Sequence, residues 1–197
     1  MENGISRSIA SEIANSAAQW GLRTAGVVLA GSALVAVCSH ISLPLWFTPV
    51  PLTLQPFAVL LLGLILGPRL AAVTLAAYLA EGAAGLPVFA PGLAFGAGVA
   101  HLLGPTGGYL MSYPAAAALV AFLRRRLARG FTGAVLSAAA GDVMILFGGM
   151  TWLAAWTHGS LPSAFALAVL PFLPGDALKV VAAAAIANGL NRVRRHV

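Results

Sequence analysis

The stretch that decides the fold is residues 24–68, TAGVVLAGSALVAVCSHISLPLWFTPVPLTLQPFAVLLLGLILGP, which contains no formally charged side chain. A helix needs only ~20 residues to cross the ~30 Å hydrocarbon core of a bilayer. The stretch is too long for one crossing and must fold back on itself, and Pro44, Pro49 and Pro51 mark the place. It therefore predicts two transmembrane helices joined by a turn.

The composition of the whole chain agrees with this interpretation. Of its 197 residues, 60% are hydrophobic and 8% are charged, whereas an average soluble domain has about 25% charged residues. So few charged side chains cannot cover the surface of a water-soluble domain, which excludes that class. Two further charge-free stretches, 82–123 and 143–175, are also too long for one crossing. We therefore predict an all-α integral membrane protein, a compact bundle of six transmembrane helices at residues 24–41, 52–67, 70–85, 108–123, 131–157 and 176–190.

The ten arginines support this division, because all of them lie before the first predicted crossing or after the second, fourth or sixth. Basic residues in short loops mark the cytoplasmic side. We therefore expect both termini in the cytoplasm of a multi-pass protein of the cell (inner) membrane, and no nucleic-acid partner. The opposite loops, 42–51, 86–107 and 158–175, contain no Lys or Arg and are rich in Pro, Gly and aromatic residues. We expect these apolar outer loops to cap a ligand pocket.

The N-terminal residues have a different pattern. Ile5, Ile9 and Ile13 recur at helical spacing among charged residues, which predicts an amphipathic helix lying on the membrane surface. The predicted division is 1–23 as this cytoplasmic interfacial segment, 24–190 as the six-helix domain, and 191–197 as a basic cytoplasmic tail.

The most informative polar residues lie in PGDALK, residues 174–179, at the outer start of the last crossing. Asp176 and Lys179 are three residues apart and so project from one helical face. Lys179 is the only lysine in the chain, and a charge inside the bilayer costs ~2.5 to 3.5 kcal/mol on insertion scales and usually marks function. We expect Asp176 to accept and Lys179 to donate hydrogen bonds to a ligand entering from outside. An internal ion pair that only neutralises itself is the alternative.

Four other polar positions allow two interpretations each. Gln55 can reach the pocket mouth or cap its own helix, and Glu81 can contact the ligand or hold a loop. Tyr109 can enter the pocket or belong to the aromatic belt at the membrane interface. Asp142 falls near mid-membrane without an obvious cationic partner in the sequence, and is expected to be protonated or bonded between helices.

Enzyme signatures are absent from the sequence. The sole lysine lies between Leu178 and Val180, so no phosphate-binding GxxxxGK[ST] loop is present, and neither HExxH nor GxSxG occurs. With a single cysteine, Cys38, and scattered histidines, neither a metal site nor a cofactor is expected. We predict that the chain is not an enzyme, and that any uphill transport takes its energy from an ion gradient or another subunit.

Six short motifs in this order resemble the BioY family, the biotin-specific substrate-binding subunits, or S components, of energy-coupling-factor (ECF) transporters. They are PVPLTLQ at 49–55, LGPR at 66–69, YL at 78–79, GLPVFA at 85–90, GPTGGYL at 104–110 and PGDALK at 174–179. The resemblance implies a subunit of an ECF-type ABC transporter that binds biotin from outside. Its partners would be a transmembrane coupling protein and two cytoplasmic ATPases, with energy supplied by the ATPases.

The resemblance also implies roles for particular residues. It places the ureido ring of biotin on Asp176 and Lys179, although a contact between Lys179 and the biotin carboxylate stays open. From their positions near the outer side, the further candidate substrate-binding residues are Gln55, Tyr109, Phe89 and Glu81. Small residues of the first helix, Gly26, Ala30 and Ala33, would face the coupling protein. The sequence Ala90-Pro91-Gly92 departs from relatives that have a polar side chain there, which puts a ligand contact after Phe89 in doubt.

Three other hypotheses remain on the sequence alone. An S component for another vitamin, such as riboflavin or thiamin, would have the same architecture. An intramembrane enzyme would use Asp142 or Glu81, but neither has a second catalytic group nearby in the sequence. A purely structural membrane adaptor would not be stabilised by any small ligand.

Overall fold

Helices make up most of the chain. The computed structural model describes residues 2–91, 98–127 and 130–196, and side chains within 19–91, 98–127 and 130–193. Gly92, Arg129 and part of the predicted outer loop 86–107 therefore lie outside the described residues. The helices are α1 (Glu2–His40), α2 (Gln55–Ile65), α3 (Pro68–Ala83), α4 (Val99–Leu102), α5 (Gly107–Arg126), α6 (Phe131–Thr157), α7 (Leu161–Ala168) and α8 (Leu173–His196). The predicted all-α class is confirmed, and the one addition is a hairpin of two short strands, β1 (Ser42–Leu43) and β2 (Leu52–Thr53).

Each predicted crossing contains one helix of the bundle. α6 has the predicted bounds, Phe131–Thr157, whereas α2 is shorter than predicted and α8 starts three residues before Asp176. Three helical stretches in the described part of the chain are long and apolar enough to cross a membrane by themselves, namely Gln19–His40, Phe131–Thr157 and Leu173–Val193. A count of six crossings therefore stays a prediction.

The short helix α2 forms the core of the bundle. It packs against α1, α3, α5, α6 and α8, and every residue from Ala58 to Leu64 is buried. A helix that is apolar all round belongs inside a larger structure. Gly63 lets α5 come close, because a Cβ there would lie 2.9 Å from the backbone oxygen of Ala117. Since protein surrounds α2, it need not match the full thickness of the bilayer.

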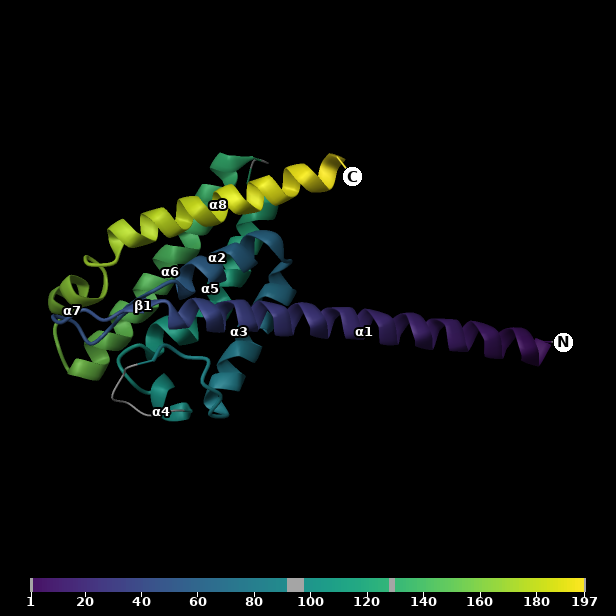
Figure 1. Cartoon of the computed structure of the whole chain (residues 1–197), viewed down its shortest axis with the longest axis horizontal. Helices are drawn as coiled ribbons and strands as arrows, with labels where there is room; N and C mark the ends of the chain where they lie inside the picture. Colours follow the sequence, from purple (N-terminus) through teal and green to yellow (C-terminus); the bar gives the residue numbers. More distant parts are fainter. Residues whose placement is uncertain (1, 92–97, 128–129, 197) are drawn as a thin grey trace.

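The first helix, α1, is continuous over 39 residues, which corresponds to about 58 Å at 1.5 Å per residue. It packs against α2 and α3 through its C-terminal part and projects beyond the bundle toward the N-terminus (Figure 1). The predicted boundary at residue 23 lies inside this helix and does not coincide with a helix end. Both termini lie on the same side of the bundle (Figure 1).

The opposite end of the bundle is closed by short elements. β1 pairs antiparallel with β2, with Ser42 opposite Thr53 and Leu43 opposite Leu52. This pairing closes the proline-containing turn that joins α1 to α2. α7 starts after Ser160, whose hydroxyl accepts a hydrogen bond from the backbone N–H of Ser163 (3.4 Å). α7 then leads directly into α8, so these elements hold the start of α8 at this end.

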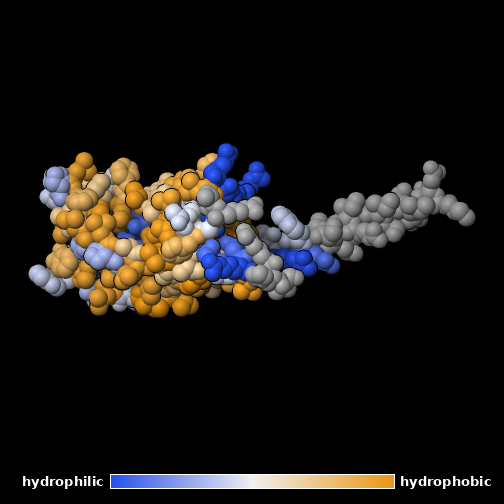
Figure 2. Space-filling model, turned by 90° about the horizontal axis from the view of Figure 1, so that it is seen from above, coloured by the Kyte–Doolittle hydropathy of each residue, from blue (hydrophilic) through white to orange (hydrophobic). Residues whose placement is uncertain are grey.

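The surface has the polarity of a protein surrounded by lipid. Large apolar side chains are exposed on α1, α6 and α8, including Leu29, Val143, Phe147 and Leu178, each more than 60% accessible. In the space-filling view the apolar surface covers the body of the bundle, and the strongly hydrophilic side chains gather at the end from which α1 projects (Figure 2). An apolar exterior of this extent requires a lipid environment, so the chain is a membrane protein.

Candidate functional site

A cavity lies at the end of the bundle that is opposite the termini. Its empty volume is about 510 Å³, counting the open space at its mouth. Helices α2, α4, α5, α6 and α8 supply its walls, together with β2 and the segments between these elements. The polar residues that line it are Thr53, Gln55, His101, Thr106, Tyr109, Tyr113, Asp176 and Lys179. Its apolar walls include Val50, Ile145, Leu146 and Phe172.

Asp176 and Lys179 face this cavity from the first turns of α8. Lys179 Nζ donates a hydrogen bond to Asp176 Oδ1 over 2.7 Å. The pair is buried, with 3% of Asp176 and 8% of Lys179 accessible. A buried charge is costly unless it is paired, and each residue here neutralises the other. Because an ammonium has three N–H donors, Lys179 keeps two for another partner.

Gln55 connects the cavity to the outer loop. Its Nε2 donates to Tyr78 Oη over 2.6 Å, and Tyr78 Oη donates in turn to the backbone oxygen of Val88 over 2.9 Å. Thr53 Oγ1 donates to Gln55 Oε1 and accepts from the Gln55 backbone N–H. The Gln55 side chain therefore lines the cavity and does not cap its own helix, because Thr53 binds the Gln55 backbone N–H instead.

Tyr109 closes the cavity at the start of α5. Its Oη donates to the backbone oxygen of Ala168 over 2.6 Å, which ties α5 to the end of α7. The ring lies against Gly149 of α6, where any Cβ would overlap it. The Phe172 ring lies beside it, with 6.2 Å between the ring centroids. Gly149 thus creates the space that the Tyr109 ring occupies.

Besides Thr53, three polar residues that line the cavity were not predicted from the sequence. Thr106 lies in the quoted motif GPTGGYL, and its buried Oγ1 has no hydrogen-bond partner among the described residues. Tyr113 lies four residues after Tyr109, so helical spacing places both on one face of α5. His101 stacks on the ring of Phe89 at 4.9 Å between centroids. The motif GPTGGYL and the helical spacing from Tyr109 could have indicated Thr106 and Tyr113. The place of His101 depends on how the outer segment folds.

Two predicted site residues do not line the cavity. The ring of Phe89 covers Gly82 and contacts Tyr78 edge to face at 5.5 Å, so it supports the cavity wall from behind. Glu81 accepts a hydrogen bond from Ser32 Oγ over 2.9 Å, which joins α3 to α1. Of its two interpretations, the structural one fits this contact.

Asp142 is buried in α6, with 7% of it accessible. Its Oδ1 has no hydrogen-bond partner within the described residues. It lies within electrostatic reach of Asp176 and Lys179, but it does not line the cavity. Neither Asp142 nor Glu81 lines the cavity, so the cavity gives no support to an enzyme that uses either of them.

The small residues of α1 lie on an open surface. Gly26, Ala30 and Ala33 are all exposed, and a Cβ at Gly26 would meet nothing within 4 Å. By contrast, a Cβ at Gly31 would collide with Thr74 of α3. The two groups of small residues thus mark two faces of α1, one turned toward the bundle and one away from it.

The chain was compared with known families, proteins and structures. Residues 11–196 match the model of the BioY family. A probable biotin transporter BioY from Pyrococcus horikoshii is 42% identical over 158 residues, or 80% of this chain and 90% of the relative. The biotin transporter BioY from Thermotoga maritima is 36% identical over 162 residues, or 82% of this chain and 92% of the relative.

A solved structure has the same fold. The crystal structure of the S-component for biotin from an ECF-type ABC transporter superposes with a TM-score of 0.80 and 26% identity. The match covers 88% of this chain and 93% of that chain. The family match spans nearly the whole bundle and includes both the cavity and the buried ion pair. The chain belongs to the BioY family.

Proposed function

We propose that this protein takes up biotin, which it binds from the outer side of the cell membrane in the cavity between α2, α5, α6 and α8. It acts as the substrate-binding subunit of an ECF-type transporter. The observation that carries the proposal is the buried Asp176–Lys179 ion pair, with its 2.7 Å contact, in the wall of a small-molecule cavity. Membership of the BioY family supports the choice of ligand.

The chemistry of the cavity matches the ureido ring of biotin. That ring has two N–H donors and one carbonyl acceptor. The Asp176 carboxylate accepts from an N–H, and Lys179 donates one of its two remaining N–H groups to the carbonyl. The thiophane ring and valeryl chain then fit the apolar walls at Ile145, Leu146 and Phe172.

The test is biotin binding to the purified protein in an uncharged detergent. We expect Asp176→Asn and Lys179→Met each to weaken binding strongly. The matched control is Glu81→Gln, which removes a carboxylate outside the cavity and should bind biotin as the wild type does. Wild-type affinity in both ion-pair variants would overturn the assignment of the site.

Biotin methyl ester resolves which end of the ligand Lys179 contacts. If Lys179 pairs with the ureido carbonyl, the ester competes with biotin almost as well as unlabelled biotin does. If Lys179 pairs with the carboxylate, the ester competes poorly for the wild-type protein. In Lys179→Met the ester and biotin then compete equally well. Riboflavin and thiamin serve as competitors in the same assay, and displacement by either one would indicate a different vitamin.

For energy the protein pairs with a transmembrane coupling subunit and two cytoplasmic ATPases. The exposed face at Gly26, Ala30 and Ala33 of α1 would allow another helix to approach closely. We expect Ala30→Leu with Ala33→Leu to abolish co-purification with a co-expressed coupling subunit while biotin binding persists. Gly21→Leu is the control, because an added side chain there also meets nothing within 4 Å. An equal loss of co-purification in the Gly21→Leu control would contradict the assignment of this interface.

In the proposed topology α1, α2, α3, α5, α6 and α8 cross the inner membrane, and residues 1–23 and 191–197 are cytoplasmic. A Cys38→Ser background permits single-cysteine labelling, since Cys38 is the only native cysteine. We expect Ser160→Cys to react with an impermeant maleimide in intact cells. Arg126→Cys should react only after permeabilisation. The reverse pattern would invert the topology.

A further inference from the structure

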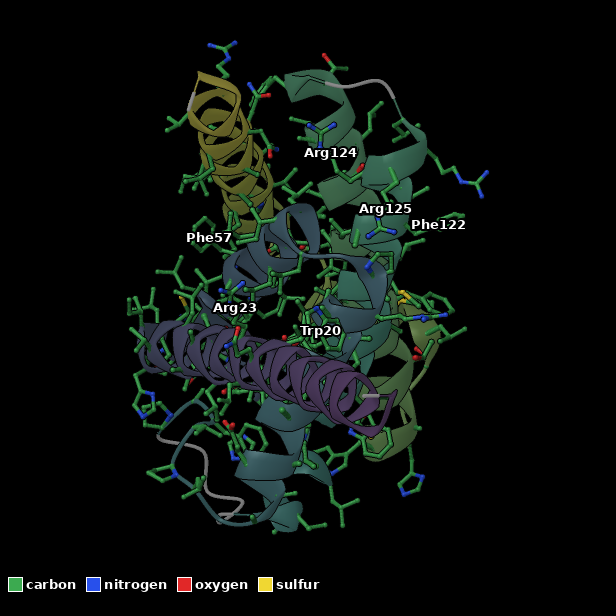
Figure 3. The ribbon with its side chains drawn as sticks, turned by 90° about the vertical axis from the view of Figure 1, so that its right-hand side faces the viewer. Trp20, Arg23, Phe57, Phe122, Arg124 and Arg125 are labelled. Atoms are coloured by element: carbon green, nitrogen blue, oxygen red, sulfur yellow. The ribbon has the colours of Figure 1, made fainter. Side chains whose placement is uncertain are left out.

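A second hollow lies at the end of the bundle where the termini lie, far along α8 from the ion pair. The C-terminal ends of α2 and α5, the start of α6 and the late turns of α8 surround it. Its empty volume is about 1730 Å³, counting the space at its mouth. We call it the basic hollow. The polar residues that line it are Arg124, Arg125, Asn188, Asn191 and Arg192. Figure 3 looks onto this end and shows Arg124 and Arg125 on α5, with α8 beside it.

The charge of the basic hollow has one sign. None of the described residues that line it is acidic. Beyond residue 18 the acidic residues of the chain are Glu81, Asp142 and Asp176, and none of them lines the hollow. Guanidinium groups form forked pairs of hydrogen bonds with phosphate oxygens, and asparagine amides add neutral donors. Three arginines around one concave surface therefore select an anion with several oxygens.

The hollow is shaped by the fold. Asn188, Asn191 and Arg192 are spaced so that they share one face of α8. Arg125 lies over the link between α2 and α3, where a Cβ added at Gly67 would come within 2.6 Å of its Nη2. Gly67 therefore leaves space for this guanidinium. A neighbouring arginine is placed differently, because Arg126 lies over the Phe122 ring at 5.1 Å and does not line the hollow.

The remaining walls are apolar. Leu64, Ile65 and Phe131 border the same hollow, so a polar head and a hydrocarbon chain could be bound side by side. From this geometry we propose that the basic hollow binds a phosphate group. The group belongs either to the headgroup of an anionic phospholipid or to a soluble phosphate compound. This site is separate from the biotin cavity and does not depend on the proposed function.

The experiment measures thermal unfolding of the delipidated protein in an uncharged detergent. The probes are short-chain phosphatidylglycerol, short-chain phosphatidylcholine and inorganic phosphate, with sodium chloride at matched ionic strength. We expect phosphatidylglycerol to raise the Tm in a saturable manner and phosphatidylcholine not to. An equal saturable rise with inorganic phosphate identifies the soluble source, and a rise with phosphatidylglycerol alone identifies the lipid.

Matched variants test whether the site is local. Arg125→Gln with Arg192→Gln should weaken the apparent affinity about 25-fold, from about fivefold per arginine. Arg69→Gln with Arg126→Gln removes the same charge from the same end without touching the hollow, and should stay within about twofold of the wild type. A cooperative thermal transition without any probe reports whether each variant is folded.

Three results would overturn the proposal. The first is the absence of a saturable Tm rise with any phosphate probe. The second is an equal loss in both double variants, because it would mean that the end attracts anions only through its total charge. The third is an Arg125→Gln, Arg192→Gln variant that responds normally to phosphate but no longer co-purifies with the coupling subunit, which would make the hollow a protein interface.

Discussion

Replacing the two members of the Asp176–Lys179 pair one at a time and then together separates ligand binding from structural neutralisation. Lys179→Met leaves the Asp176 carboxylate with 3% of the residue accessible and without its 2.7 Å partner. Breaking a buried pair in this way typically costs about 3 to 5 kcal/mol of stability. The double variant Asp176→Asn, Lys179→Met removes both charges. Since neutral residues can often replace a buried pair without loss, we expect it to regain most of that stability.

Biotin affinity should follow a different order. Each member of the pair offers the ligand a hydrogen bond involving a charged group, and such bonds contribute about 1.5 to 3 kcal/mol. Each single variant should therefore lose roughly 10- to 150-fold in affinity, and the double variant at least about 100-fold. Stability recovers in the double variant whereas binding does not.

Both quantities can be measured on the same samples. Unfolding in mixed micelles by titration with sodium dodecyl sulfate gives the stability, and equilibrium binding of radiolabelled biotin gives the affinity. Glu81→Gln is the reference for carboxylate loss outside the cavity. A double variant that is stable and binds biotin like the wild type would refute the reasoning, because the pair would then serve only to neutralise itself.

Three further predictions concern the cavity and its surroundings. Thr106→Val should keep or raise the Tm, because Oγ1 has no partner among the described residues. It should weaken biotin binding about fivefold, and an unchanged affinity would show that Thr106 does not contact biotin. Gly149→Ala should lower stability by about 1 to 3 kcal/mol by displacing the Tyr109 ring, whereas Gly189→Ala, which meets nothing within 4 Å, should not. Asp142→Asn should raise the Tm with little change in biotin affinity, and loss of binding would place Asp142 in the site.

Charge-free stretches and prolines were enough to predict the positions of the six crossing helices, but not the short helices α4 and α7 in the outer loops. α6 was predicted with its observed bounds because Gly130 precedes it and a long, mainly apolar run follows, in which Asp142 is the only charged side chain. The ends of α2 were predicted too wide, because Leu52 and Thr53 pair with the strand β1. Two-residue strands have no periodicity in sequence, so their pairing depends on where the rest of the chain brings them.

The relative positions of candidate site residues were easiest to predict where the residues share one helix. Asp176 and Lys179 are neighbours on α8 whatever the tertiary structure, and they line the cavity together. Phe89 was placed in the site because it is an aromatic residue in an outer loop, but its ring packs over Gly82 behind the wall. His101 was missed because the segment that contains it was predicted as an outer loop, and only the fold brings its side chain to the cavity. Loop side chains are positioned by contacts between distant segments, which spacing along the chain does not encode.

The position of the ion pair on a single helix also has a consequence for specificity. Because Asp176 and Lys179 are three residues apart on α8, they can enter the bilayer already paired and nearly neutral. A ligand must then satisfy both groups together, since a group that draws only one of them away leaves the other buried and unpaired. A simple carboxylate or a simple cation would break the pair. A neutral group with adjacent N–H donors and a carbonyl acceptor can bind both members without separating their charges, and this requirement favours a cyclic urea.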